Sequence, residues 1–319
     1  MMATLLREKV ELNPSPSQAS FVDATEQKLI LRDDRTLGYA EYGDPSGKPI
    51  FFFHGGAGSR LEHPADICAI GARIICIDRP GHGLSDFQPD RKLVDWPDDV
   101  AQLADNLGIN SFYVLGWSAG GPHALVCAYL LPDRVMSGAV AAGLGPMNRP
   151  GAIRGLGFAG RTYVFAARYF PWLIGFFRRM ARNTIWGNAE KAKQQLLSAI
   201  PNDDKESMLQ SGNLDMWFAD VREGYKQGWQ GVALDDIIII QDWGFDIADI
   251  NCRIDIWHGE QDRNVPISSS EYMQERIPNS RATFLPGEEH LFLLSHWATV
   301  VQTLVTDLEG EEPEYCVRS

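Results

Sequence analysis

The chain has 319 residues, of which 45% are hydrophobic, and it carries a formal net charge of −13 at pH 7. A chain of this length and composition can bury one large core together with an inserted segment. Because nucleic acids bind basic surfaces, the acidic balance excludes nucleic acid as an expected partner.

The amino terminus is predicted to be a mobile arm, because residues 1–24 are rich in Pro, Ser and Asn. Charged residues at positions 7–9 stand where a signal peptide needs an apolar stretch, so we expect a cytoplasmic protein. The five cysteines are widely scattered, which indicates neither a disulfide framework nor a metal site. The last four residues formally match a prenylation box, but Arg318 occupies a position that should be aliphatic, and we do not predict this modification.

Strands and helices alternate along most of the chain. Residues 28–32 and 37–42 predict a first hairpin, and the continuous apolar runs 50–53 and 73–77 are typical of strands buried in a parallel sheet. Further strands are predicted at 112–115, 135–141, 254–257 and 282–285, and helices at 93–106 and 292–308. The pattern predicts an α/β fold with a mostly parallel central sheet of about eight strands flanked by helices, built from residues 25–143 and 242–319.

Between residues 144 and 241 the alternation stops, and a helical segment is predicted to form an inserted cap. Its stretch from 163 to 180 is rich in aromatic residues and flanked by arginines. We favour packing of cap helices on the core, with Pro171 dividing one helix into two. A pocket for an apolar substrate is a second interpretation, with Phe158, Trp217 and Phe218 as candidate binding residues. Adhesion to a membrane surface is a third.

A serine is predicted at the apex of a tight turn. Gly116-Trp117-Ser118-Ala119-Gly120 follows the apolar run 112–115 and precedes a helical stretch. Glycines two positions before and after the serine let the backbone turn sharply, so the Ser118 hydroxyl should stand clear at the carboxyl end of the sheet. A serine in this position can attack a carbonyl carbon.

A serine nucleophile needs a histidine base that is oriented by a carboxylate. Of the seven histidines, His290 alone lies downstream of Ser118 in a loop directly after a late strand. Its rivals are His258, at the end of the strand 254–257, and His296, within the last helix. The sequence therefore indicates His290 as the base.

The carboxylate is predicted to be Asp262, which lies in the loop that follows the strand 254–257. Glu260 is the nearest competitor but lies close to the strand end, whereas the turn at 265–266 would hold Asp262 toward the site. The strand 135–141 is followed by no acidic residue that could replace it.

The loop at residues 54–59 has the sequence His-Gly-Gly-Ala-Gly-Ser and directly follows the strand 50–53. Acyl transfer requires backbone N–H groups that point at the oxyanion of the tetrahedral intermediate. We expect Ala119 and Gly56 to supply them, and we expect His54 to shape the loop by hydrogen bonding.

These motifs resemble the α/β-hydrolase superfamily over residues 29–308, including the Asp-Arg-Pro-Gly-His-Gly-Leu-Ser-Asp loop at 78–86. The loop at 54–56 is similar to that of proline-iminopeptidase-like members, which usually have Gly-Ser-Trp-Gly at the nucleophile instead. The resemblance implies a serine hydrolase that cleaves an ester, lactone or related carbonyl bond of a small, apolar substrate. An epoxide hydrolase or haloalkane dehalogenase would need an aspartate at position 118.

The same resemblance leaves several activities open. The triad could serve a carbon–carbon hydrolase, a non-hydrolytic lyase or a peptidase, and the fold could serve a ligand receptor. None of these requires a metal or an organic cofactor. We expect a small-molecule substrate and no membrane association. The chain could form a homodimer.

Overall fold

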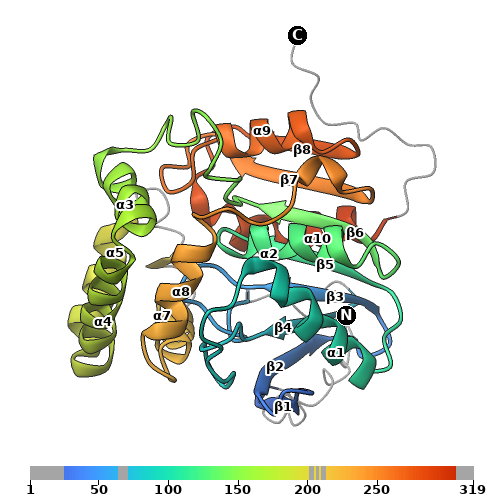
Figure 1. Ribbon diagram of the computed structural model, residues 1–319, viewed down its shortest axis with the longest axis horizontal. Helices are drawn as coiled ribbons and strands as arrows, with labels where there is room; N and C mark the ends of the chain where they lie inside the picture. The colour runs from blue at the N-terminus through green and yellow to red at the C-terminus, as the bar shows by residue number, and fades with distance from the viewer. Residues whose placement is uncertain (1–24, 64–70, 201–204, 206–207, 210–212, 307–319) are drawn as a thin grey trace, which may run out of the picture.

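The computed structural model describes residues 25–63, 71–200, 205, 208–209 and 213–306 (Figure 1). The predicted arm at 1–24 and the carboxyl-terminal box at 316–319 lie outside these residues. An eight-stranded sheet with the order β1-β2-β4-β3-β5-β6-β7-β8 forms the centre. Its strands are β1 (Gln27–Ile30), β2 (Thr36–Gly43), β3 (Lys48–Phe53), β4 (Ala72–Ile77), β5 (Phe112–Trp117), β6 (Val135–Ala141), β7 (Arg253–Gly259) and β8 (Ser280–Leu285).

The sheet is mostly parallel, which confirms the predicted fold class. Strand β2 pairs antiparallel with β1 and with β4, and every other pairing in the sheet is parallel. The parallel pairings place the carboxyl ends of β3 to β8 at one edge of the sheet. Loops that leave this edge are where ligands bind in open α/β sheets.

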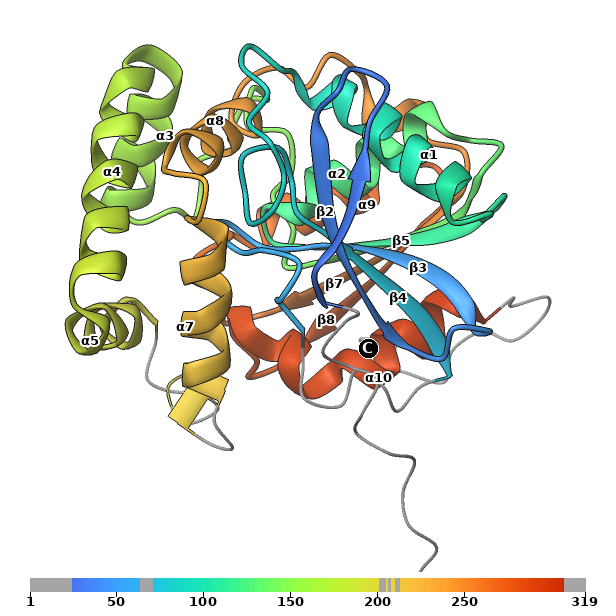
Figure 2. The ribbon, with the colours of Figure 1, turned by 90° about the horizontal axis from the view of Figure 1, so that it is seen from below.

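Helices cover both faces of the sheet (Figures 1 and 2). Helices α1, α2 and α9 cover one face and α10 covers the other. The helical elements are η4 (Leu93–Asp95), α1 (Trp96–Asn106), α2 (Gly120–Leu130), α3 (Phe158–Tyr169), α4 (Pro171–Gly187), α5 (Ala189–Ala199), α7 (Asn213–Gly224), α8 (Gln230–Ile238), η5 (Ile247–Asp249), α9 (Ser268–Arg276), η6 (His290–Phe292) and α10 (Leu293–Val305). Among the described helices, none is both long and apolar enough to cross a membrane.

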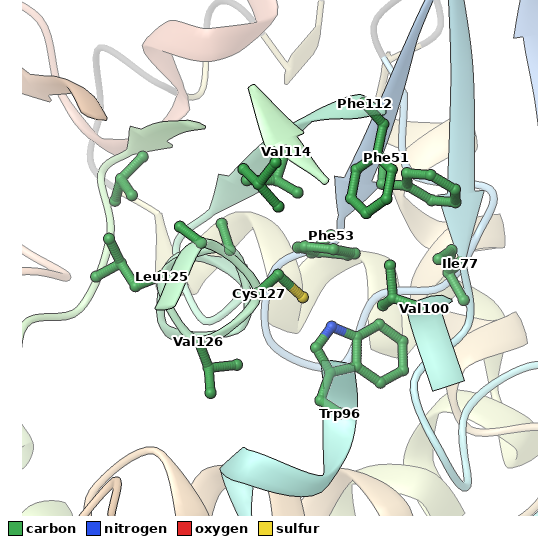
Figure 3. Close-up of a cluster of buried hydrophobic side chains, with 14 of the residues drawn as sticks. Phe51, Phe53, Ile77, Trp96, Val100, Phe112, Val114, Leu125, Val126 and Cys127 are labelled. Atoms are coloured by element: carbon green, nitrogen blue, oxygen red, sulfur yellow. The ribbon is translucent and has the colours of Figure 1, made fainter. Parts of the chain in front are cut away.

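Strand β3 shows why the buried strands read as unbroken apolar runs. Its side chains alternate, so Phe51 and Phe53 enter the cluster under α1 and α2, whereas Phe52 enters the cluster under α10. The Phe53 ring lies 5.5 Å from the Trp96 ring in a nearly perpendicular arrangement, with Cys127 beside them (Figure 3). This packing holds the end of β3, and thus the loop that follows it, in a fixed position.

Helices α3 to α8 lie between β6 and β7 in the chain and gather at one end of the molecule's longest axis (Figures 1 and 2). Pro171 separates α3 from α4, as predicted, because its ring fits the first position of a helix and not the interior. Helix α4 packs on α3, α5, α7 and α8. The isoleucine run at 237–240 belongs to the end of α8 and the turn after it.

Candidate active site

Ser118 occupies a strained turn between β5 and α2. Its φ angle is +53°, in the left-handed region that residues other than glycine rarely adopt. A Cβ on Gly120 would lie 2.0 Å from the Phe53 carbonyl oxygen, and one on Gly116 would lie 2.3 Å from the Gly120 carbonyl oxygen. Only glycine fits at both flanking positions, so the two glycines of the motif permit this turn.

The structure brings Ser118, His290 and Asp262 together. The Nε2 atom of His290 lies 3.1 Å from the Ser118 hydroxyl oxygen, and its Nδ1 atom lies 2.7 Å from a carboxylate oxygen of Asp262. These residues follow β5, β8 and β7, whose carboxyl ends share one edge of the sheet. Both distances suit proton transfer through the imidazole ring.

The two rival histidines are engaged elsewhere. The ring of His258 is held by the Ser270 hydroxyl at 2.8 Å and the Val265 carbonyl at 3.0 Å. Its Nε2 atom lies 3.5 Å from Oδ2 of Asp262, the carboxylate oxygen that His290 contacts at 2.7 Å. His296 bonds the Phe292 carbonyl within its own helical turn.

Asp262 is fixed so that one carboxylate oxygen faces His290. Its Oδ1 atom accepts hydrogen bonds from the backbone N–H groups of Asn264, at 2.7 Å, and Val265, at 2.9 Å. The side chain is fully buried. Burial alone would raise the pKa of Asp262, but the adjacent His290 and these hydrogen bonds hold it below its ordinary value. The group therefore remains ionised near neutral pH.

Arg79 orients the loop that follows β3. Its guanidinium donates to the carbonyl of His54 at 2.5 Å and to that of Gly55 at 2.8 Å. Because C=O and N–H point in opposite directions in a trans peptide, the Gly56 N–H points away from Arg79. A Cβ on Gly56 would lie 3.9 Å from that of Ala119, so the two candidate oxyanion donors are neighbours. Ala119 is the N-cap residue of α2, at the end of the helix where N–H groups have no partner within the helix.

His54 hydrogen-bonds within this loop, through its Nδ1 atom to the Gly55 carbonyl at 2.9 Å. Its Nε2 atom accepts from the Arg79 backbone N–H at 3.4 Å. Burial and the nearby Arg79 guanidinium lower the pKa of His54 well below its ordinary value. The neutral ring shapes the loop, in agreement with the role that the sequence suggested.

Two buried carboxyl groups lie beneath the same loop. Glu62 accepts a hydrogen bond from the Gly55 N–H, and Asp220 of α7 accepts from both the N–H and the hydroxyl of Ser59. Oxygens of both carboxyls lie within 3.3 Å of the position that a Cβ on Gly58 would take. Sequence reasoning missed this pair, since nothing in the local pattern shows that residues 158 positions apart meet.

These carboxyls line a narrow cavity beside the triad. Apolar side chains form most of the remaining wall, which includes Leu61, Trp117, Met208, Met216, Trp217 and Leu294. The Trp117 ring stacks on that of His290 at 6.2 Å, which places this cavity next to the catalytic histidine candidate. The arrangement suits a small apolar group with a polar substituent.

Of the three predicted substrate-binding residues, only Trp217 lines the cavity. Phe218 is buried in a cluster with Ala57 and Ile185. Phe158 does not line this cavity, and its side chain is 85% exposed at the start of α3, so its role in binding stays a prediction. Aromatic content alone did not show which way the helix faces.

Replacing Glu62 by Gln should remove a pH-dependent loss of stability. Burial raises the pKa of Glu62 from 4.5 to about 7, so in this range the folded chain holds a proton that the unfolded chain has released. The contribution of Glu62 to the free energy of unfolding therefore falls as the pH rises from about 4.5 to above about 7, by up to about 3 kcal/mol. Denaturant unfolding at about pH 5 and about pH 8 should show a smaller decrease for Glu62→Gln than for wild type.

The matched control is Glu190→Gln, since the Glu190 side chain is 82% exposed. This variant should lose as much stability between the two pH values as wild type. An unchanged pH dependence in Glu62→Gln would contradict the assignment of the titrating group.

Within the described parts of the chain, no group of three or more His, Cys, Asp or Glu side chains has an arrangement that could hold a metal ion.

The chain is similar in sequence to a known family and to several curated proteins. A family model described as the alpha/beta hydrolase fold matches residues 48–296. A dihydrolipoyllysine-residue acetyltransferase component of an acetoin cleaving system from Pseudomonas putida is 35% identical over 116 residues, 35% of this chain and 31% of that protein. A proline iminopeptidase from Xanthomonas citri is 36% identical over 116 residues, 32% of this chain and 35% of that protein. The chain thus spans about a third of the length of the curated relatives it matches.

Solved structures are similar over a larger part of the chain. An esterase from Rhodococcus sp. ECU1013 has a TM-score of 0.65 at 21% identity, covering 88% of this chain and 98% of that one. The enol-lactonase from Burkholderia xenovorans LB400 has a TM-score of 0.62 at 16% identity, with the same coverages of 88% and 98%. At these identities the likeness shows a shared fold.

Proposed function

The chain belongs to the α/β-hydrolase fold family, and on that premise we propose that it is a serine hydrolase that cleaves an ester, lactone or related carbonyl bond through an acyl-enzyme. The observation that carries the proposal is the ring of His290, bonded at 3.1 Å to Ser118 and at 2.7 Å to Asp262. A fixed imidazole between a serine and a buried carboxylate is the arrangement that activates a serine nucleophile.

In the proposed reaction, Ser118 attacks the carbonyl carbon while His290 Nε2 takes the hydroxyl proton. The negative charge that develops on the carbonyl oxygen is stabilised by the N–H groups of Gly56 and Ala119. His290 then gives its proton to the leaving group. A water molecule, deprotonated by His290, releases the acyl group, and Asp262 stabilises the imidazolium in both halves of the reaction.

We propose that the helices from α3 to α8 act as the cap, with Trp217 of α7 above the substrate. Exclusion of water by such a cap strengthens the interaction between the oxyanion and its donors. The cavity wall of Trp117, Met216 and Trp217 supports an apolar acyl or ring group as the part of the substrate that is bound there.

The test is covalent labelling with a fluorophosphonate probe, together with turnover of short and long acyl esters and lactones. Wild type should label and hydrolyse at least one class, and Ser118→Ala should do neither. Labelling without turnover of any ester or lactone would instead favour a carbon–carbon hydrolase, a lyase or a ligand receptor. Absence of labelling in folded wild type would contradict a reactive serine.

A second candidate is a peptidase activity of the kind named by the proline iminopeptidase relatives. An iminopeptidase must bind a protonated amine, and two buried carboxyls line the cavity at Glu62 and Asp220. Among the described residues, the Oδ2 atom of Asp220 has no hydrogen-bond partner, so it could accept from such an amine. Turnover of a prolyl anilide but of no ester or lactone would favour this candidate.

Trp217→Ala should change the substrate preference of the enzyme more than it changes the reactivity of Ser118. The indole borders the cavity but does not belong to the group of residues that perform the reaction. Added space should raise kcat/KM for bulky acyl groups relative to short ones by about tenfold or more. Labelling of Ser118 by the small probe should continue.

The control is Trp172→Ala on α4, because that indole is 68% exposed. It should leave the preference of the enzyme unchanged. Equal preferences in Trp217→Ala and wild type would mean that Trp217 only packs α7 against its neighbours.

A further inference from the structure

Helices α3 and α4 carry large aromatic side chains that face solvent. Phe158 is 85% exposed, Trp172 is 68% exposed and Tyr169 is 60% exposed. Exposed apolar groups of this size and number are uncommon on a surface that contacts only water. We call the following set the aromatic face: Phe158, Phe165 and Tyr169 on α3, with Trp172, Phe176 and Met180 on α4.

Helical spacing explains why these side chains point outward together. Positions 158, 165 and 169 share one side of α3, and positions 172, 176 and 180 share one side of α4. The opposite sides bury Val164 and Ile174, which pack into the cluster with α8. These buried side chains pack α3 and α4 on their neighbours without the aromatic face. The interpretation that the sequence favoured, packing of the cap helices on the core, therefore does not explain the exposed aromatic side chains.

The same segment is strongly basic in an acidic protein. Residues 144–189 contain seven arginines and no Asp, Glu or Lys, although the whole chain has a net charge of −13. Arg161, Arg168 and Arg179 are exposed on α3 and α4. A surface that combines aromatic rings with cations is complementary to one that is apolar and anionic.

The position of the helices makes this face accessible to a flat partner. Both views place α3 and α4 at one end of the longest axis, outside α7 and α8 (Figures 1 and 2). Helix α4 packs through its inner side on α8, with α7 next to it. Its outer side thus forms part of a projecting end of the molecule.

We propose that the aromatic face docks on the surface of a lipid bilayer that contains anionic lipids. Aromatic rings are favoured at the level of the headgroups, and arginines beside them are attracted to anionic headgroups. A second copy of the chain fits less well, because a symmetric contact would set the same arginines against one another. This proposal takes up the third interpretation that the sequence offered for this segment, against the expectation of no membrane association, and it does not depend on the proposed hydrolase activity.

The experiment is flotation of the full chain with two kinds of vesicle, one of phosphatidylcholine alone and one that also contains phosphatidylglycerol. Wild type should float with the anionic vesicles, less with the neutral ones, and less again at high salt, because salt screens the arginines. The double variant Trp172→Ala/Phe176→Ala should bind at least about tenfold more weakly, since it removes two inserted rings. Arg179→Gln should weaken binding to the anionic vesicles alone.

The matched control is Ile30→Ala, which removes an exposed apolar side chain from β1 and should float as wild type does. Thermal unfolding should show that all variants are folded, and sedimentation velocity should show the same oligomeric state for each. Equal flotation of the double variant and wild type, or no flotation of wild type, would overturn the proposal. So would a wild-type dimer that does not float and that becomes monomeric in the double variant, because the occupant would then be a second copy.

Discussion

Ser118→Ala is expected to lower kcat by on the order of 10⁴-fold or more and to abolish labelling by a fluorophosphonate. The hydroxyl oxygen of Ser118 is the atom that would form the acyl-enzyme, and it lies 3.1 Å from the His290 nitrogen that would take its proton. Without it, only substrate binding and the oxyanion donors remain to accelerate attack by water. The measurement is steady-state hydrolysis of the best ester or lactone, with mass spectrometry of the labelled protein.

Ser111→Ala is the matched control. Ser111 is exposed and lies directly before β5, whereas Ser118 follows the other end of the same strand. It should retain wild-type rates and full labelling. Retained turnover in a folded Ser118→Ala variant would mean that another group is the nucleophile.

Asp262→Asn is expected to cost on the order of 10⁴-fold in kcat while leaving the fold intact. The backbone N–H groups of Asn264 and Val265 both donate to Oδ1 of Asp262, so the amide oxygen of Asn must take that place. The amide NH₂ group then faces His290 Nδ1. Because that nitrogen would have to accept a hydrogen bond, the ring proton would move to Nε2, where it blocks proton removal from Ser118.

The measurement is kcat as a function of pH. Asp262→Asn should show the loss over the whole neutral range, with partial recovery at high pH where hydroxide replaces the missing base. Glu260→Gln is the control, since Glu260 is the other acidic residue that the sequence offered in this loop. A loss in Glu260→Gln comparable with that in Asp262→Asn would remove Asp262 from the proposed triad.

Several features of the site are local, and for that reason the sequence predicted them. The turn at Ser118 requires glycine at 116 and 120, because a Cβ at either position would collide with backbone atoms. The choice of His290 and Asp262 followed from their places after late strands, since carboxyl ends of parallel strands share an edge. The structure places the three residues within hydrogen-bonding distance.

The order of the strands in the sheet and the contacts of the cap helices could not be predicted from sequence patterns. Hydrophobic runs predicted the buried strands, but they did not show that β4 lies between β2 and β3 in the sheet. Aromatic content singled out this segment, but it did not show that the side of α3 that carries Phe158 faces solvent. A periodic pattern identifies which residues point together and not what they touch.

The sequence by itself determined the class of fold and the turn at Ser118, because strand periodicity and turn sterics act between near neighbours in the chain. It also indicated His290 and Asp262, because the carboxyl ends of parallel strands share an edge of the sheet. Only the tertiary structure decided which groups surround them. Arg79 orients the loop after β3, and Asp220 reaches that loop from α7, across a separation of 161 residues from Ser59. Burial, the pKa of Glu62 and the exposure of the aromatic face all arise from contacts between distant segments, and such contacts are set by the packing of the whole chain.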